Sequence, residues 1–170
     1  IKNEFHSIVD GSPFSLNKED DSDPEIYGLI GTSLTIRELA ERMITVSSNL
    51  ATNILIELVG PENVMSTLEL LGIRRMRVLR GVEDGKAFER GWNNQTDAHD
   101  LLRVMEAIAS GKAGSLPSCR EMTLILEKQK FRDGIPAGVP AGVPVGNKTG
   151  SITGMEHDAA IVSPPGRRPY

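Results

Sequence analysis

Apolar residues recur every three or four positions through the middle of the chain, which is the spacing of an amphipathic α-helix. Leu39, Met43 and Val46 follow this spacing. Thr35 and Glu38 form the pattern of a capping box, in which each residue's side chain accepts a hydrogen bond from the other's backbone N–H. The pattern therefore predicts a helix that begins after Thr35 and ends near Val46, where a short polar run follows.

The same periodicity predicts further helices after this polar run. A second helix follows it directly, and Pro61, a residue favoured at the first helical position, starts a third. Another helix is expected over residues 97–109. Ser118 and Glu121 form a second capping-box pattern, which predicts a helix from there to about Lys130.

The periodicity changes near the end of the chain. Residues 134–146 repeat Pro-Ala-Gly-Val and form a Gly/Pro-rich linker. Residues 147–152 and 159–163 are then expected to be strands, with a turn at residues 154–157. The predicted organisation is thus a block of helices followed by the start of a sheet.

These patterns divide the chain into an irregular lead-in over residues 1–34, an all-helical block over 35–133, and a linker with a partial β-sheet over 134–170. Residues 80–95 form a long, irregular loop inside the block, and loops of this length are usually functional or disordered. Two strands cannot complete a sheet alone. We therefore expect them to pair with missing segments of the same protein or with another copy of the chain.

Composition narrows the function classes. Hydrophobic residues make up 39% of the chain and charged residues 25%, which is typical of a globular protein. A net charge of −4 and only 4% aromatic residues disfavour a nucleic-acid partner. No apolar run approaches the roughly 20 residues that span a bilayer. Cys119 is the single cysteine, so it forms no internal disulfide and no cysteine-based zinc site, and we expect neither metal nor other cofactor.

Two short polar motifs could carry chemistry. Residues 47–49, Ser-Ser-Asn, lie at the expected junction between two helices, and residues 148–151, Lys-Thr-Gly-Ser, lie on an expected strand. Each motif has an ordinary structural explanation, because Ser and Asn commonly cap helices and a strand-edge lysine is commonly exposed. Their order and settings make the pair more specific than either motif alone.

Together the two motifs resemble the second and third elements of the penicillin-recognising serine enzymes, whose elements are S-x-x-K, S-D-N and K-T-G. Residues 34–55 and 140–150 are similar to the segments around these elements in class A β-lactamases. The resemblance covers about residues 30–165. It implies a mostly-α fold, which is the helical domain of a β-lactamase/transpeptidase-like α/β fold plus the first strands of its antiparallel sheet. It also implies a fragment that lacks the N-terminal S-x-x-K segment and the C-terminal strands.

The resemblance assigns roles to the motif residues. Ser47 would relay a proton to the leaving ring nitrogen of a β-lactam, and Lys148 would supply positive charge for the substrate carboxylate. The backbone N–H of Ser151 would stabilise the oxyanion. The substrate-binding positions implied by the resemblance are Asn49, Thr149, Gly150 and Ser151.

The chain departs from the family pattern at two places. Ser48 replaces the central Asp of S-D-N, so the junction must be held differently. The loop over residues 80–95 lacks the E-x-x-L-N of the family's Ω loop, whose glutamate activates the deacylating water. Glu83 and Glu89 are the candidates, and we favour Glu83 because it lies nearest the start of the loop. The alternative is that both are solvated loop acids.

The sequence contains no convincing match to the S-x-x-K element that carries the family's nucleophile. Ser15 opens the one literal S-x-x-K match, but the acidic residues after Lys18 give no apolar helical face. We expect instead that the nucleophile lies upstream of Ile1, in a longer protein that is periplasmic or secreted. His157 and Asp158 follow the Lys-Thr-Gly motif, where the histidine either binds substrate or caps a turn.

The leading hypothesis is a serine hydrolase that opens β-lactam rings through an acyl-enzyme, although the fragment alone is expected to be inactive. One alternative is a penicillin-binding peptidase or esterase of the same superfamily, which would act on a related amide or ester. Another is a non-catalytic relative that serves as a binding module. Loss of Glu83 or Glu89 separates the first two, because only a lactamase uses such an acid for deacylation.

Overall fold

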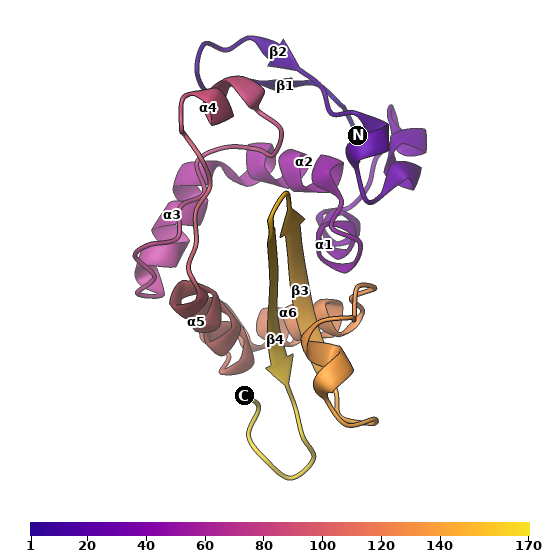
Figure 1. Ribbon diagram of the computed structural model, residues 1–170, viewed down its shortest axis with the longest axis vertical. Helices are drawn as coiled ribbons and strands as arrows, with labels where there is room; N and C mark the ends of the chain where they lie inside the picture. The colour runs from indigo at the N-terminus through magenta and orange to yellow at the C-terminus, as the bar shows by residue number, and fades with distance from the viewer.

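The computed structural model describes residues 1–170 and contains six α-helices and two antiparallel hairpins. The helical block followed by a hairpin confirms the predicted mostly-α fold class (Figure 1). The elements in chain order are β1 (Phe5–His6), β2 (Pro13–Phe14), the 3₁₀ helices η1 (Lys18–Asp20) and η2 (Pro24–Leu29), α1 (Ile36–Thr45), α2 (Asn49–Val59), α3 (Pro61–Leu70), α4 (Gly85–Glu89), α5 (Ala98–Ala109), α6 (Leu116–Glu127), η3 (Ile135–Gly138), β3 (Val145–Ile152) and β4 (Met155–Val162).

Helix α1 begins as its sequence predicts. The Thr35 hydroxyl accepts a hydrogen bond from the Glu38 N–H at 3.2 Å, and the Glu38 carboxylate accepts one from the Thr35 N–H at 2.7 Å. This capping box satisfies backbone donors that the helix itself leaves unpaired.

The predicted capping box of Ser118 and Glu121 is wrong. Helix α6 begins earlier, at Leu116, and its N-cap is Ser115, whose hydroxyl accepts from the Ser118 N–H at 3.2 Å. Glu121 instead forms an ion pair with Arg37 of α1 at 2.6 Å. Ser115 and Ser118 are both possible N-caps in the sequence, and the ion pair with Arg37 draws the Glu121 side chain away from Ser118.

The predicted turn over residues 154–157 is also wrong. Strand β3 pairs with β4 without interruption from Val145 opposite Val162 to Ile152 opposite Met155, so only two residues connect the strands. Gly154 in this connection has φ 78°, a left-handed conformation that glycine adopts without steric cost. Residues 155–158 therefore belong to a strand, although their polar character is typical of a turn.

The hairpin of β3 and β4 packs on the helices, with β3 against α6 and β4 against α5 (Figure 1). Met105, Leu126 and Ile161 form the buried cluster between them. Gly146 makes the close crossing possible, because a Cβ at this position would lie 2.9 Å from Leu126 Cβ. The base of β3 is thereby fixed to the helical block.

The lead-in over residues 1–34 is more ordered than predicted. It contains the short hairpin of β1 and β2, and it contributes Phe5, Leu16 and Ile26 to the main hydrophobic core with α1 and α2. Such short elements give little periodicity in the sequence. None of the helices has the length and apolar character that a membrane crossing requires.

After β4 the chain turns back on itself. Tyr170 exchanges two backbone hydrogen bonds with Val162, at 2.7 and 3.0 Å. Pairing of this sheet with a further strand, from the same protein or another copy, stays a prediction.

Candidate functional site

A cleft of about 970 Å³ lies between the α1–α2 junction and the β3–β4 hairpin. Residues 47 and 49 line it from the junction, and residues 148–151 line it from β3. The fold thus brings two motifs that are about a hundred residues apart in sequence to the same cavity. The motif residues that line the cleft are Ser47, Asn49, Lys148, Thr149, Gly150 and Ser151.

Ser47 occupies a strained turn between two helices. Its φ of 54° is left-handed, which is unfavourable for a residue with a Cβ. Helix α1 ends at Thr45, and Ser48 caps α2 by accepting from the Ala51 N–H at 3.3 Å. Strain of this kind persists only when the surrounding structure over-determines it, and it is concentrated at functional sites.

Lys148 reaches across the cleft and donates a hydrogen bond to the Ser47 hydroxyl. Its ammonium group also donates to the Thr149 carbonyl. The side chain is half-buried, and this burial lowers the pKa of Lys148, while the nearby Asp158 carboxylate opposes the shift. A partly desolvated ammonium beside a hydroxyl can hold a substrate anion and can also favour proton transfer through that hydroxyl.

Glu83 contacts the junction motif through a hydrogen bond with Asn49. The Asn49 side-chain amide donates to the Glu83 carboxylate at 3.0 Å. Glu83 has φ 63°, so it and Ser47 are the two non-glycine residues of the chain with left-handed backbones. Partial desolvation raises the pKa of Glu83, the carboxylates of Asp20 and Asp21 raise it further, and the Asn49 hydrogen bond opposes the shift. Glu83 and Glu89 are both exposed and neither lines the cleft, but Glu83 contacts the cleft residue Asn49, whereas Glu89, in α4, forms no hydrogen bond with it.

Sequence reasoning missed the residue that holds Glu83 in place. Asn53, one helical turn after Asn49, is fully buried and exchanges two hydrogen bonds with the backbone of Val82, accepting at 2.6 Å and donating at 3.0 Å. Gly81 allows this contact, because a Cβ there would lie 2.7 Å from the Asn53 oxygen. Helical spacing places Asn53 opposite the apolar positions Ala51, Ile54 and Leu55, so the sequence pattern carries no signal of its burial.

The other candidates lie differently. Ser15 is exposed after β2 and does not line the cleft. His157 lies on β4 opposite Gly150 and lines the cleft, so it does not cap a turn. Asp158 also lines the cleft, and it accepts hydrogen bonds from the buried Asn147 amide at 3.0 Å and from the Ile135 N–H at 2.8 Å. Cys119 is buried within α6.

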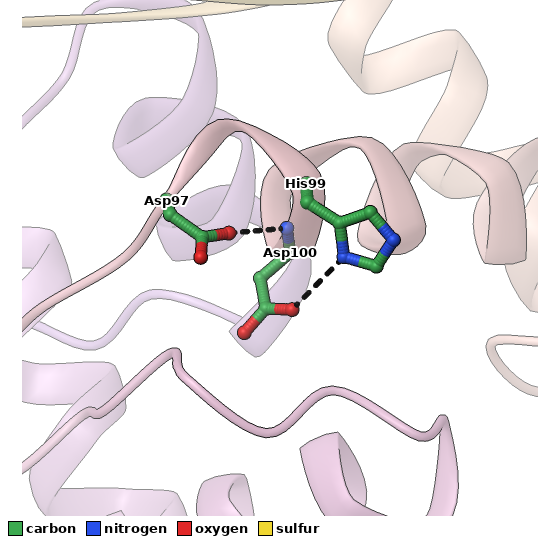
Figure 2. A group of neighbouring side chains, drawn as sticks. All are labelled: Asp97, His99 and Asp100. Atoms are coloured by element: carbon green, nitrogen blue, oxygen red, sulfur yellow. Dashed lines mark hydrogen bonds and ion pairs between the residues drawn. The ribbon is translucent and has the colours of Figure 1, made fainter.

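One group of side chains has the composition of a metal site. Asp97, His99 and Asp100 lie together at the start of α5 (Figure 2). Their oxygens already have partners, because Asp97 caps the helix by accepting from the Asp100 N–H at 2.8 Å, and Asp100 accepts from the N–H groups of Arg75 and Met76 at 2.6 and 2.7 Å. The group is explained as a helix cap that also anchors the loop after α3.

Comparison with known proteins gives a consistent picture. The profile of the Beta-lactamase enzyme family matches residues 12–170, whereas no curated protein matches the chain. A β-lactamase from Sphaerobacter thermophilus is 34% identical, with a TM-score of 0.73 over 78% of this chain and 51% of that one. A class A β-lactamase from Mycobacterium abscessus is 25% identical, with a TM-score of 0.73 over 86% of this chain and 57% of that one.

An ancestral class A β-lactamase, reconstructed for the last common ancestor of Gram-negative bacteria, is 27% identical. Its TM-score is 0.76, and the match covers 99% of this chain and 64% of that one. The chain therefore spans between about half and two thirds of the length of these structures.

Proposed function

The chain belongs to the beta-lactamase enzyme family, and from this premise we propose that it forms the substrate-binding and proton-relay part of a serine hydrolase site that opens β-lactam rings through an acyl-enzyme intermediate. The observation that carries this proposal is the backbone strain at Ser47 and Glu83, because Ser47 lines the cleft and accepts from Lys148, and Glu83 accepts from Asn49, which lines the same cleft. Ordinary helix capping would account for the polar residues but not for two strained ones.

Each motif residue would have a separate role in binding or opening a β-lactam. The Lys148 ammonium and the Thr149 hydroxyl would bind the substrate carboxylate at one end of the cleft. Asn49 would donate to the acylamino carbonyl, and the Ser151 N–H would stabilise the oxyanion that forms on the ring carbonyl. As the nucleophile's oxygen bonds to the ring carbonyl carbon and the ring C–N bond breaks, Ser47 would pass its hydroxyl proton to the nitrogen and recover one from the adjacent Lys148 ammonium. The proton that the nucleophile releases on attack would restore the ammonium.

Glu83 would act in the second step, in which water releases the acyl group. A general base works best when its pKa is close to the working pH, and the raised pKa of Glu83 moves this carboxyl in that direction. The acid would accept a proton from the attacking water and return it to the nucleophile as the acyl bond breaks. We place the nucleophile in sequence outside residues 1–170, since Ser15 is exposed and does not line the cleft.

The test is acylation of the longer gene product by a fluorescent penicillin, read by intact mass, in Glu83→Gln with Glu89→Gln as the matched control. We expect Glu83→Gln to accumulate the adduct and Glu89→Gln to turn over like the wild type. A wild type that already accumulates the adduct, with no effect of Glu83→Gln, would indicate a peptidase or esterase. No adduct in any variant would indicate a non-catalytic binding module.

A further inference from the structure

A buried acid from the lead-in segment lies across the start of α2. Asp21, between η1 and η2, is only 7% exposed. One carboxylate oxygen accepts from the N–H groups of Asn49 and Asp23 at 3.1 and 2.9 Å. The other accepts from the Leu50 N–H at 2.9 Å and from the Tyr27 hydroxyl at 3.1 Å. The carboxylate is thus fully occupied, and two of its four partners are the first N–H groups of α2.

Helix α2 needs such an acceptor. The first N–H groups of an α-helix have no partner within the helix, and their partial positive charge favours a nearby anion. Ser48 satisfies only the Ala51 N–H, and its hydroxyl carries no charge. The S-D-N motif of the family supplies an acid at this central position, whereas here the acid comes from Asp21, in a segment distant in sequence.

A second acid of the same segment fixes the other side of the junction. The Asp23 carboxylate accepts two hydrogen bonds from the Arg42 guanidinium, at 2.8 and 2.9 Å. The Arg42 carbonyl in turn accepts from the N–H groups of Val46 and Ser48 at 3.3 and 3.2 Å. Ser47 therefore lies between the end of α1, anchored through Asp23, and the start of α2, anchored by Asp21.

We propose that Asp21 is a positioning residue that holds Asn49 and the strained Ser47 at the cleft, in place of the acid that Ser48 lacks. Asp21 does not itself line the cleft, so it acts through the backbone of α2. The inference rests on the proposed function only for what Asn49 and Ser47 bind.

The first test is amide hydrogen exchange in Asp21→Asn, with Glu19→Gln as the control. Both variants remove one negative charge from the same segment, but Glu19 is exposed. Asparagine replaces one accepting oxygen with an NH₂ group and removes the charge that strengthens these hydrogen bonds. The Asn49 and Leu50 amides have no partner within α2, so their protection reports the Asp21 contact.

We expect exchange at Asn49 and Leu50 to accelerate about tenfold in Asp21→Asn, while amides of α5 and the Glu19→Gln protein stay unchanged. Unchanged exchange at Asn49 and Leu50 would overturn the inference. An equal acceleration in α5 would overturn it as well, because it would indicate general loss of stability.

The second test asks whether an acid inside the junction can take over the role of Asp21. Binding of benzylpenicillin is measured in Asp21→Asn, in Ser48→Asp and in the double variant. We expect about tenfold weaker binding in Asp21→Asn, weaker binding in Ser48→Asp because two carboxylates then compete for one helix start, and recovery in the double variant. Additive losses in the double variant would contradict the inference. If the wild type does not bind benzylpenicillin, the proposed function fails, whereas the exchange data still decide the role of Asp21.

Discussion

Replacement of Asn53 by alanine tests the link between α2 and the loop that carries Glu83. Asn53 is 1% exposed, and it is the side chain of α2 that exchanges two hydrogen bonds with Val82, the residue before Glu83. Alanine removes both hydrogen bonds and leaves the space that the amide fills against Gly81. We therefore expect the loop to lose its anchor and the free energy of unfolding to fall.

The size of this loss follows from the contacts. Each hydrogen bond contributes about 1 kcal/mol net, and a buried backbone group left without a partner costs about 1–3 kcal/mol. Val82 is only half-buried, so water can partly replace the lost partner. We therefore expect Asn53→Ala to lower the free energy of unfolding by about 2–3 kcal/mol.

Urea unfolding followed by circular dichroism measures this difference, with Asn63→Ala as the matched control. Asn63 is exposed in α3 and makes one hydrogen bond, to the Val59 carbonyl at 2.7 Å, so its loss should cost less than about 0.5 kcal/mol. If Asn53→Ala is as stable as Asn63→Ala, the anchoring role of Asn53 is refuted.

Three further predictions use other sites. Gly146→Ala forces a Cβ to within 2.9 Å of Leu126 and should lower the free energy of unfolding by about 1–3 kcal/mol. Gly138→Ala is the control and should change it little, because a Cβ there meets nothing within 4 Å, so equal urea midpoints for the two variants would refute the close crossing of β3 and α6. The pKa of Glu83 is raised on folding, so the unfolded chain releases this proton first, and stability falls as pH rises through the ordinary value of 4.5. Glu83→Gln should therefore gain stability over the wild type above pH 4.5 but not well below it, and a gain independent of pH would contradict this. Burial lowers the pKa of Lys148, so penicillin binding should weaken at alkaline pH before the ordinary value of 10.5 is reached; binding that holds up to that pH would argue against a role for its charge.

Sequence patterns predicted the parts of the fold that depend on neighbouring residues. The start of α1 follows from a local exchange of hydrogen bonds between Thr35 and Glu38, so four residues suffice to identify it. The strand that carries Lys148 was expected because the periodicity changes after the Gly/Pro linker. Local patterns failed where tertiary contacts decide, as for Glu121, which pairs with Arg37 and does not cap its own helix.

The arrangement of the site was less predictable for the same reason. Position in the loop favours Glu83 over Glu89, but the contact of Glu83 with Asn49 depends on the anchoring of Val82 by Asn53, which no sequence pattern predicts. The role of Asp21 depends on a contact with the start of α2 that no spacing rule predicts. An acidic run is ordinarily solvated, and here the fold buries one of its members.

The most direct test of the account is a titration of this chain with benzylpenicillin, followed through the backbone amide signals of Gly150 and Ser151. The variant is Lys148→Met, and the control is Lys112→Met, which removes an exposed lysine outside the cleft. We expect saturable shifts at both amides in the wild type and in Lys112→Met, and their loss in Lys148→Met. Shifts that persist unchanged in Lys148→Met, or a wild type that shows none, would contradict a β-lactam site in this cleft.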